Sequence, residues 1–341
     1  MITTENFGIY KGRKATLYVL KNDYLEVGIT DFGGIVQRFI VNSEKGKVDI
    51  VCSQTNCEEY VNADAHMGGT IGRVANRIAN GEFTLNGVCY VLDKNAGNAC
   101  LHGGFSPYDY RFFDAKIDGE TLVLTLDSPD MDQGFPGHLK FTAKFKLTGN
   151  RLSVYFEGVS DKDTLFNPTN HAYFNLNGEG SGKNYNTKVM IDSDKITLAD
   201  DNLVVTGEVM DVKGTPFDFT SFKTIAPDIF SDDKNVKSAG GFDHNYILKS
   251  KHVATAVGDK TGITLDMYTD LPGVQFYCGN MIGDIKGKSR YFIHDAFCLE
   301  PQYFPNAINC EGFDKPILKA NQTVSHYIDY VITENQIRNI F

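Results

Sequence analysis

The chain has 341 residues with 33 basic and 43 acidic side chains, which give a net charge of −10 at neutral pH. Nucleic acids and anionic membranes are bound by clustered basic faces, so this balance disfavours both as partners. A hydrophobic content of 42%, with 24 Phe and 17 Tyr, is sufficient for a large packed core. The chain has no apolar run of the roughly 18 residues that a membrane-spanning helix needs.

Compartment and domain organisation follow from the same simple features. Residues 1–6 lack the basic start and apolar stretch of a secretory signal. The seven cysteines are odd in number and none has CxxC spacing, so reduced, buried thiols and a cytoplasmic protein are expected. No Pro- or Ser-rich linker divides the chain, which predicts one domain over residues 1–341. A monomer or a homodimer is expected, and no heptad pattern or exposed apolar stripe decides between the two.

Short strands joined by tight turns dominate the chain from its N-terminus onward. Runs at 16–20 and 24–29 flank Lys21-Asn22-Asp23 and predict a hairpin. Runs at 82–85 and 88–91 flank Asn86-Gly87, a pair that supplies the two positive-φ positions of a two-residue turn. Further strand-like runs lie at 121–126, 139–147, 152–156, 188–191, 244–248, 262–268, 274–277, 296–299 and 324–332.

Helical patterns are scarce by comparison. Residues 56–61 and 334–341 are each expected to form a turn or two of helix. Many short strands separated by Gly and Asn turns are typical of an all-β protein with a large antiparallel β-sandwich. With this many strands, the sheets must be large and strongly curved.

Common cofactor and nucleophile motifs are absent. The segment Gly258-Asp259-Lys260-Thr261 lacks the P-loop glycines, and the glycine-rich residues 68–72 lack the βαβ context of a dinucleotide loop. The histidines never fall at the spacing of a zinc site, and no serine lies in a G-x-S-x-G elbow. No metal and no cofactor are therefore expected.

Polar residues interrupt the apolar pattern in five segments that could bind a hydroxyl-rich ligand. An arginine can donate two hydrogen bonds to vicinal hydroxyls, and amide, hydroxyl and imidazole groups grip several hydroxyls at once. An acid that ends an apolar strand needs partners. Taken singly, each segment is also typical of a surface loop or turn. The five segments are residues 72–81, 101–104, 167–176, 240–246 and 297–306.

Together, and in this order, these segments resemble the aldose 1-epimerase (mutarotase, galactose mutarotase) family. The resemblance spans residues 32–309 and includes G-R-V-A-N-R-I, L-H-G-G, N-P-T-N-H-x-Y-F-N-L, F-D-H-N-Y, V-Q-F-Y-C-G-N and L-E-P-Q. It implies a supersandwich of β-sheets with a concave sugar-binding groove. The chain departs from the family pattern at Pro301, Tyr303 and Asn306, where relatives tend to have Thr or Ser, His or Asn, and Asp. This departure is expected to affect substrate preference or support of the site more than the chemistry.

The resemblance assigns Glu300 as general base and His171 as general acid. Sugar hydroxyls would be bound by Asn76, Arg77, His102, Tyr173, Asp243 and Gln275. The implied reaction interconverts the α and β anomers of an aldohexose, galactose or glucose, by opening and reclosing the ring. One proton leaves the C1 hydroxyl and one reaches the ring oxygen, so a carboxylate and an imidazole suffice without a cofactor. A monosaccharide is the expected partner.

Three other functions fit parts of the pattern. A glycosidase would use Asp243 and Glu300 as its carboxylate pair, but the absence of Trp disfavours the aromatic platforms of a long cleft. A non-catalytic sugar sensor would not need an imidazole and a carboxylate placed for proton transfer. A mutarotase for phosphorylated hexoses would need additional Lys or Arg, which the net charge disfavours.

Overall fold

Strands dominate the computed structural model, which describes residues 1–43 and 46–334. Within these residues the strands form one nine-stranded sheet, two five-stranded sheets and several two-stranded ones. The large antiparallel sandwich predicted from the sequence is confirmed. No helix in the described part of the chain is long and apolar enough to cross a membrane.

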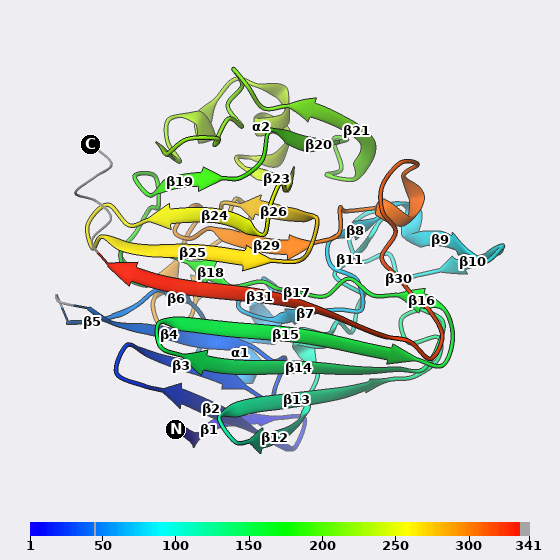
Figure 1. Ribbon diagram of the computed structural model, residues 1–341, viewed down its shortest axis with the longest axis horizontal. Helices are drawn as coiled ribbons and strands as arrows, with labels where there is room; N and C mark the ends of the chain where they lie inside the picture. The colour runs from blue at the N-terminus through cyan, green and yellow to red at the C-terminus, as the bar shows by residue number, and fades with distance from the viewer. Residues whose placement is uncertain (44–45, 335–341) are drawn as a thin grey trace.

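The nine-stranded sheet extends across the molecule with β31 at its centre (Figure 1). Burial alternates along β14, where Leu139, Phe141 and Phe145 are buried and Lys140 is exposed, so one face of this sheet points to the core. The strands lie in the order β12 (Asp114–Asp118), β13 (Thr121–Ser128), β14 (Leu139–Thr148), β15 (Arg151–Ser160), β31 (Thr323–Glu334), β25 (Ile263–Thr269), β24 (His252–Val257), β19 (Lys188–Ile191) and β22 (Lys223–Thr224).

Two five-stranded sheets complete the sandwich. The first holds β1 (Ile2–Tyr10), β2 (Arg13–Lys21), β3 (Leu25–Thr30), β4 (Val36–Ser43) and β5 (Gly46–Asp49) in chain order. The second has the order β21 (Val205–Asp211), β20 (Lys195–Ala199), β23 (Asp243–Ile247), β26 (Gly273–Tyr277) and β29 (Cys298–Gln302). One apolar cluster joins side chains of all three large sheets, among them Val27, Phe145 and Phe276. The main core therefore lies where the three sheets meet.

Short elements connect the sheets, and some of them line the cavity described below. The two-stranded pairs are β6 (Val51–Cys52) with β18 (Tyr173–Phe174), β7 (Thr70–Ile71) with β17 (Thr169–Asn170), β8 (Arg77–Ile78) with β11 (Cys100–Leu101), β9 (Glu82–Leu85) with β10 (Val88–Val91), β16 (Thr164–Leu165) with β30 (Ile317–Leu318), and β27 (Ile285–Lys286) with β28 (Arg290–Tyr291). The helices are α1 (Cys57–Ala63) and α2 (Lys234–Ala239), with 3₁₀ turns η1 (Ala79–Gly81), η2 (Tyr108–Tyr110), η3 (Asp228–Phe230) and η4 (Ala307–Asn309).

Local sequence signals are confirmed where they were specific. Leu85 pairs with Val88 across the predicted turn, and Asn86 and Gly87 have φ values of 52° and 78°. The first predicted helix corresponds to α1. The second was expected over 334–341, but β31 continues to Glu334 and the remaining residues lie outside those described. All seven cysteines are free thiols, and six of them are buried as predicted. The exception is Cys89, on the β9–β10 hairpin, which is exposed.

Arg73 shows how a buried charge can serve the fold. Its side chain is buried against Phe135, with the guanidinium carbon 5.8 Å from the ring centroid. Arg73 belongs to the same polar segment as Arg77, yet its guanidinium does not line the cavity described below. Its nitrogens donate to backbone carbonyls of Ser128, Pro129, Pro136 and Gly137 and to the hydroxyls of Ser128 and Thr164.

We expect Arg73→Lys to lower the free energy of unfolding by about 2–3 kcal/mol, because an ammonium cannot reach acceptors that a planar fork satisfies together. Urea unfolding followed by circular dichroism measures this change. Arg151→Lys is the control, since Arg151 is half-exposed and its ion pair with Asp329 contributes less than about 1 kcal/mol. Equal midpoints for the two variants would show that Arg73 does not stabilise the fold as described.

Candidate active site

The inner face of three neighbouring strands carries a row of polar side chains. In the antiparallel register Asn245 of β23 lies opposite Gln275 of β26, which lies opposite Glu300 of β29. Opposed residues point to the same face of a sheet, so the three side chains stand side by side, and Asp243 extends the same face. The alternate positions, such as Phe276, pack into the core. Period-two alternation thus separates the core from a polar face on the same strands.

A cavity of about 910 Å³ lies beside this face. All the side chains predicted to form the site line it except Gln275. Loops after β11 and β17, the start of β8 and the end of α1 close its walls, so residues far apart in the sequence meet here. The predicted residues on its lining are Asn76, Arg77, His102, His171, Tyr173, Asp243 and Glu300.

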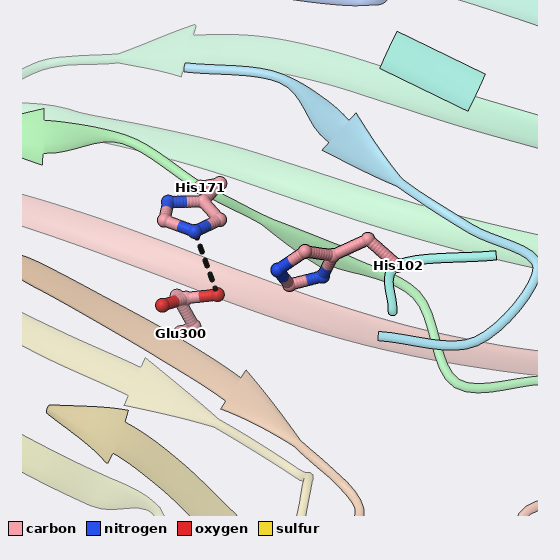
Figure 2. A group of neighbouring side chains, drawn as sticks. All are labelled: His102, His171 and Glu300. Atoms are coloured by element: carbon pink, nitrogen blue, oxygen red, sulfur yellow. Dashed lines mark ion pairs between the residues drawn. The ribbon is translucent and has the colours of Figure 1, made fainter. Parts of the chain in front are cut away.

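Glu300 and His171 both line this cavity, and their side chains face one another (Figure 2). The Glu300 Oε2 atom lies 3.5 Å from His171 Nε2, and the two residues are only 2% and 5% exposed. The imidazole stacks on Tyr173, with ring centroids 5.0 Å apart and an interplanar angle of 9°. The Tyr173 hydroxyl donates to the Ala65 carbonyl, and the backbone N–H of His171 donates to the Gly69 carbonyl. Tyr173 is therefore a support for the imidazole, with its hydroxyl already engaged.

His102 is locked to Asn76 by a pair of hydrogen bonds. The backbone N–H of His102 donates to the backbone carbonyl of Asn76 (3.1 Å), and the backbone N–H of Asn76 donates to the ring nitrogen Nδ1 of His102 (3.2 Å). Because Nδ1 accepts, the proton of the neutral ring is on Nε2, which makes this atom a donor. A Cβ at Gly103 would lie 2.3 Å from the Gly72 carbonyl oxygen, so the L-H-G-G segment requires glycine at this point.

Asp243 and Arg77 form a charged wall. Gln275 donates from Nε2 to Asp243 Oδ1 at 2.6 Å, so Gln275 orients this carboxylate and does not itself line the cavity. Burial raises the pKa of Asp243, and both the charge of Arg77 and the bond from Gln275 oppose the increase. The Arg77 backbone is held in turn by Asn306, whose N–H donates to the Arg77 carbonyl at 2.9 Å.

The three positions that depart from the family pattern lie outside the cavity lining. Pro301 is opposite Val274 on the core side of the sheet. The Tyr303 N–H donates to Asn167 Oδ1 at 2.8 Å, and Asn306 supports the segment that carries Arg77. Their structural role is to hold the strands and loops that bear the site.

Burial opposes charge on both members of the central pair. Burial raises the pKa of Glu300 well above its usual range, the Asp243 carboxylate adds to this increase, and Arg77 opposes it. Burial, together with positive charge on His66, lowers the pKa of His171 to about 3. The two side chains are close enough for an ion pair, but burial disfavours the ionised carboxylate and the imidazolium alike.

His102, His171 and Glu300 also have the composition of a metal site, with donor atoms within 4.8 Å of one another (Figure 2). A metal ligand must offer a lone pair. Nε2 of His102 carries the ring proton because Nδ1 accepts from Asn76, so this nitrogen donates into the cavity instead. The donor set does not fit a resident metal ion.

His66 also lines the cavity but was not predicted from the sequence. It lies in the loop between α1 and β7, with its ring centroid 4.9 Å from that of His102 and 6.3 Å from that of His171. The sequence signal is its position just before Gly68 and Gly69, whose backbones hydrogen-bond to the backbone of His171.

Comparison with known proteins gives one consistent result. The family model described as aldose 1-epimerase matches residues 16–331. The chain is 34% identical to galactose mutarotase of Sus scrofa, covering 97% of this chain and 98% of the relative, and 33% identical to aldose 1-epimerase of Escherichia coli, covering 94% and 95%. The crystal structure of galactose 1-epimerase from Lactobacillus acidophilus superposes with a TM-score of 0.87 at 26% identity, over 98% of this chain and 99% of that one. The chain therefore belongs to the aldose 1-epimerase family of isomerases.

Proposed function

We propose that this protein interconverts the α and β anomers of an aldohexose, galactose or glucose, with Glu300 as general base and His171 as general acid. The observation that carries the proposal is the 3.5 Å approach of these two buried side chains on the lining of a polar cavity. The family membership of the chain supports the same reaction. Asn76, Arg77, His102 and Asp243 supply the hydrogen-bonding groups that hold the sugar hydroxyls around the pair.

Every proton in the reaction returns to its origin. Glu300 takes the proton of the C1 hydroxyl, the C1 carbonyl forms as the bond from C1 to the ring oxygen breaks, and His171 protonates the ring oxygen. The aldehyde then rotates about the C1–C2 bond. On reclosure, the former ring oxygen attacks the other face of C1 and returns its proton to His171, while Glu300 reprotonates the new C1 oxygen. No electrons leave the sugar, so no cofactor takes part.

Sugar binding sets the protonation state for this cycle. Burial favours a proton on Glu300 and a neutral His171 in the free pair, whereas the reaction begins with an ionised Glu300 and a protonated His171. These two states contain the same number of protons and differ only in which of the two side chains carries the shared proton. The C1 hydroxyl donates to the carboxylate and the ring oxygen accepts from the imidazolium, so the bound sugar stabilises the charge-separated form.

The charge of the cavity favours an uncharged sugar over a phosphorylated one. Even without Glu300, whose pKa is raised by burial, acidic side chains outnumber basic ones on its lining, with Glu59, Asp64, Asp243 and Asp284 against Arg77 and Lys286. Lys286 is already paired with Glu59, with Nζ 3.1 Å from Oε1. A phosphate would meet net negative charge here.

Glu300→Gln is expected to reduce kcat by about 10²–10⁴-fold, because it preserves the shape of the side chain and removes its basic oxygen. Polarimetry of freshly dissolved α-galactose, with and without protein, measures the rate, and wild-type protein must accelerate it. Glu157→Gln, in the nine-stranded sheet, serves as the control. A folded Glu300→Gln protein with kcat near that of wild type would eliminate Glu300 as the base.

His171→Asn separates proton donation from binding. The amide keeps a donor of similar reach but cannot deliver a proton, so kcat should fall by roughly two or more orders of magnitude while sugar still binds. Polarimetry gives kcat and calorimetry gives the Kd for galactose. His252→Asn, at a half-buried histidine on β24, is the matched control. Near-normal kcat in folded His171→Asn would make His102 the next candidate for the acid.

Asp243→Asn is expected to move the alkaline limb of the kcat/KM profile to lower pH. The Asp243 carboxylate raises the pKa of Glu300, so removing this charge lets the pair lose its single proton at lower pH. The profile of kcat/KM reports the free enzyme, which makes the limb position independent of any loss of sugar affinity. The fully exposed Asp232 provides the control Asp232→Asn. An unchanged limb, or a shift to higher pH, would contradict this electrostatic coupling.

A further inference from the structure

His66, on the lining of the cavity, pairs with the buried side chain of Asp109. Nδ1 of His66 lies 2.8 Å from Asp109 Oδ2, and the two side chains are 13% and 1% exposed. The pair joins two segments that are distant in sequence, since Asp109 belongs to η2 and His66 precedes β7. Of the two, only His66 lines the cavity.

Asp109 fixes the orientation and the tautomer of the imidazole. A carboxylate accepts hydrogen bonds, so Nδ1 of His66 carries a proton and donates it to Asp109. Within residues 1–43 and 46–334 nothing hydrogen-bonds to Nε2, the second ring nitrogen of His66. The exposed part of this side chain is therefore available to a molecule in the cavity.

The surrounding packing is built to admit this pair. A Cβ on Gly69 would lie 2.5 Å from the Cβ of Asp109, so glycine is required for the carboxylate to reach its place. The His66 ring stacks on Tyr110, with centroids 5.5 Å apart and an interplanar angle of 11°. The backbone of His66 has a left-handed φ of 54°. Burying polar side chains and holding a non-glycine residue at a left-handed φ both cost free energy, which an apolar side chain in this wall would not.

The charge on His66 suits a hydroxyl ligand in either protonation state. Burial alone would lower the pKa of His66, but the charge and hydrogen bond of Asp109, together with Asp64, raise it above the ordinary value. Nε2 donates a hydrogen bond when the ring is protonated and accepts one when the ring is neutral. A hydroxyl group can accept in the first case and donate in the second. Contact with a sugar hydroxyl is thus possible on both sides of the His66 pKa.

We propose that His66 is a further substrate-binding residue, whose Nε2 hydrogen-bonds a hydroxyl of the sugar while Asp109 acts as the positioning residue for its ring. This inference rests on the proposed function in one respect, that the ligand of the cavity is a monosaccharide. It adds a third histidine to the polar wall formed by His102 and His171.

His66→Phe tests the proposal with galactose and its monodeoxy analogues lacking the hydroxyl at C2, C3, C4 or C6. For galactose, kcat/KM should fall about tenfold, mostly through KM, and the calorimetric Kd should rise by a similar factor, because one hydrogen bond to a buried group is lost. For the one analogue that lacks the contacted hydroxyl, wild type and variant should have the same kcat/KM. His66→Gln and Asp109→Asn should give smaller losses with the same analogue singled out.

A second His–Asp pair in this chain is the matched control. Nδ1 of His326 lies 3.0 Å from Asp270 Oδ2, and neither residue lines the cavity. His326→Phe should leave kcat/KM and Kd unchanged for every sugar, which separates a contact with substrate from the loss of a His–Asp hydrogen bond. Thermal unfolding shows which variants are folded.

Two outcomes would overturn the inference. In the first, folded His66→Phe and His66→Gln proteins bind and convert galactose as wild type does. In the second, their kcat/KM falls by the same factor for galactose and for every analogue. The calorimetric arm tests the contact even in a protein that lacks mutarotase activity. A wild-type protein that binds galactose without accelerating mutarotation would refute the proposed function and leave the contact of His66 to be decided by Kd alone.

Discussion

The antiparallel register of β23, β26 and β29 is the constraint on which the site depends. It places Asn245, Gln275 and Glu300 in one row, and the alternate residues between them pack into the main core. A shift of one residue in any of these strands would turn its polar side chains into the core and its apolar ones into the cavity. The apolar packing that stabilises the sandwich therefore also fixes where the carboxylate of Glu300 stands, because both depend on the same register.

Much of this architecture can be predicted from local sequence patterns. The Asn86-Gly87 turn and the alternating strands such as β13 and β14 were predicted because they follow simple periodic rules. Other strands were missed for physical reasons. β1 is an edge strand whose side chains are largely exposed, so it lacks an apolar alternation, and β24 is buried on both faces, so it lacks a polar one. The pairing of distant segments around the cavity was accessible only through the family resemblance.

The arginines and histidines show where sequence patterns lose their power. Arg73 and Arg77 lie four residues apart, yet Asn76 has a left-handed φ of 62°, and one guanidinium supports the fold while the other faces the cavity. Gln275 was expected to bind substrate, and in the structure its amide donates to Asp243. His66 belongs to no matched motif, and its partner Asp109 comes from another loop, so only the folded chain brings this pair to the cavity. Side-chain direction and long-range pairing are tertiary properties that a single sequence does not encode in any local pattern.

The electrostatics of the central pair connect this packing to the proposed chemistry. Burial favours a protonated Glu300 beside a neutral His171. In the proposed cycle, this is also the protonation state that follows ring opening, when Glu300 has taken the C1 proton and His171 has given up its own. The same burial that disfavours two separated charges in the free protein thus stabilises the open-chain intermediate relative to the ion pair that precedes it. Catalysis requires stronger interactions on the way to the transition state than in the ground state. The burial of these two titratable groups meets this requirement, and the packed sheets around β29 provide it.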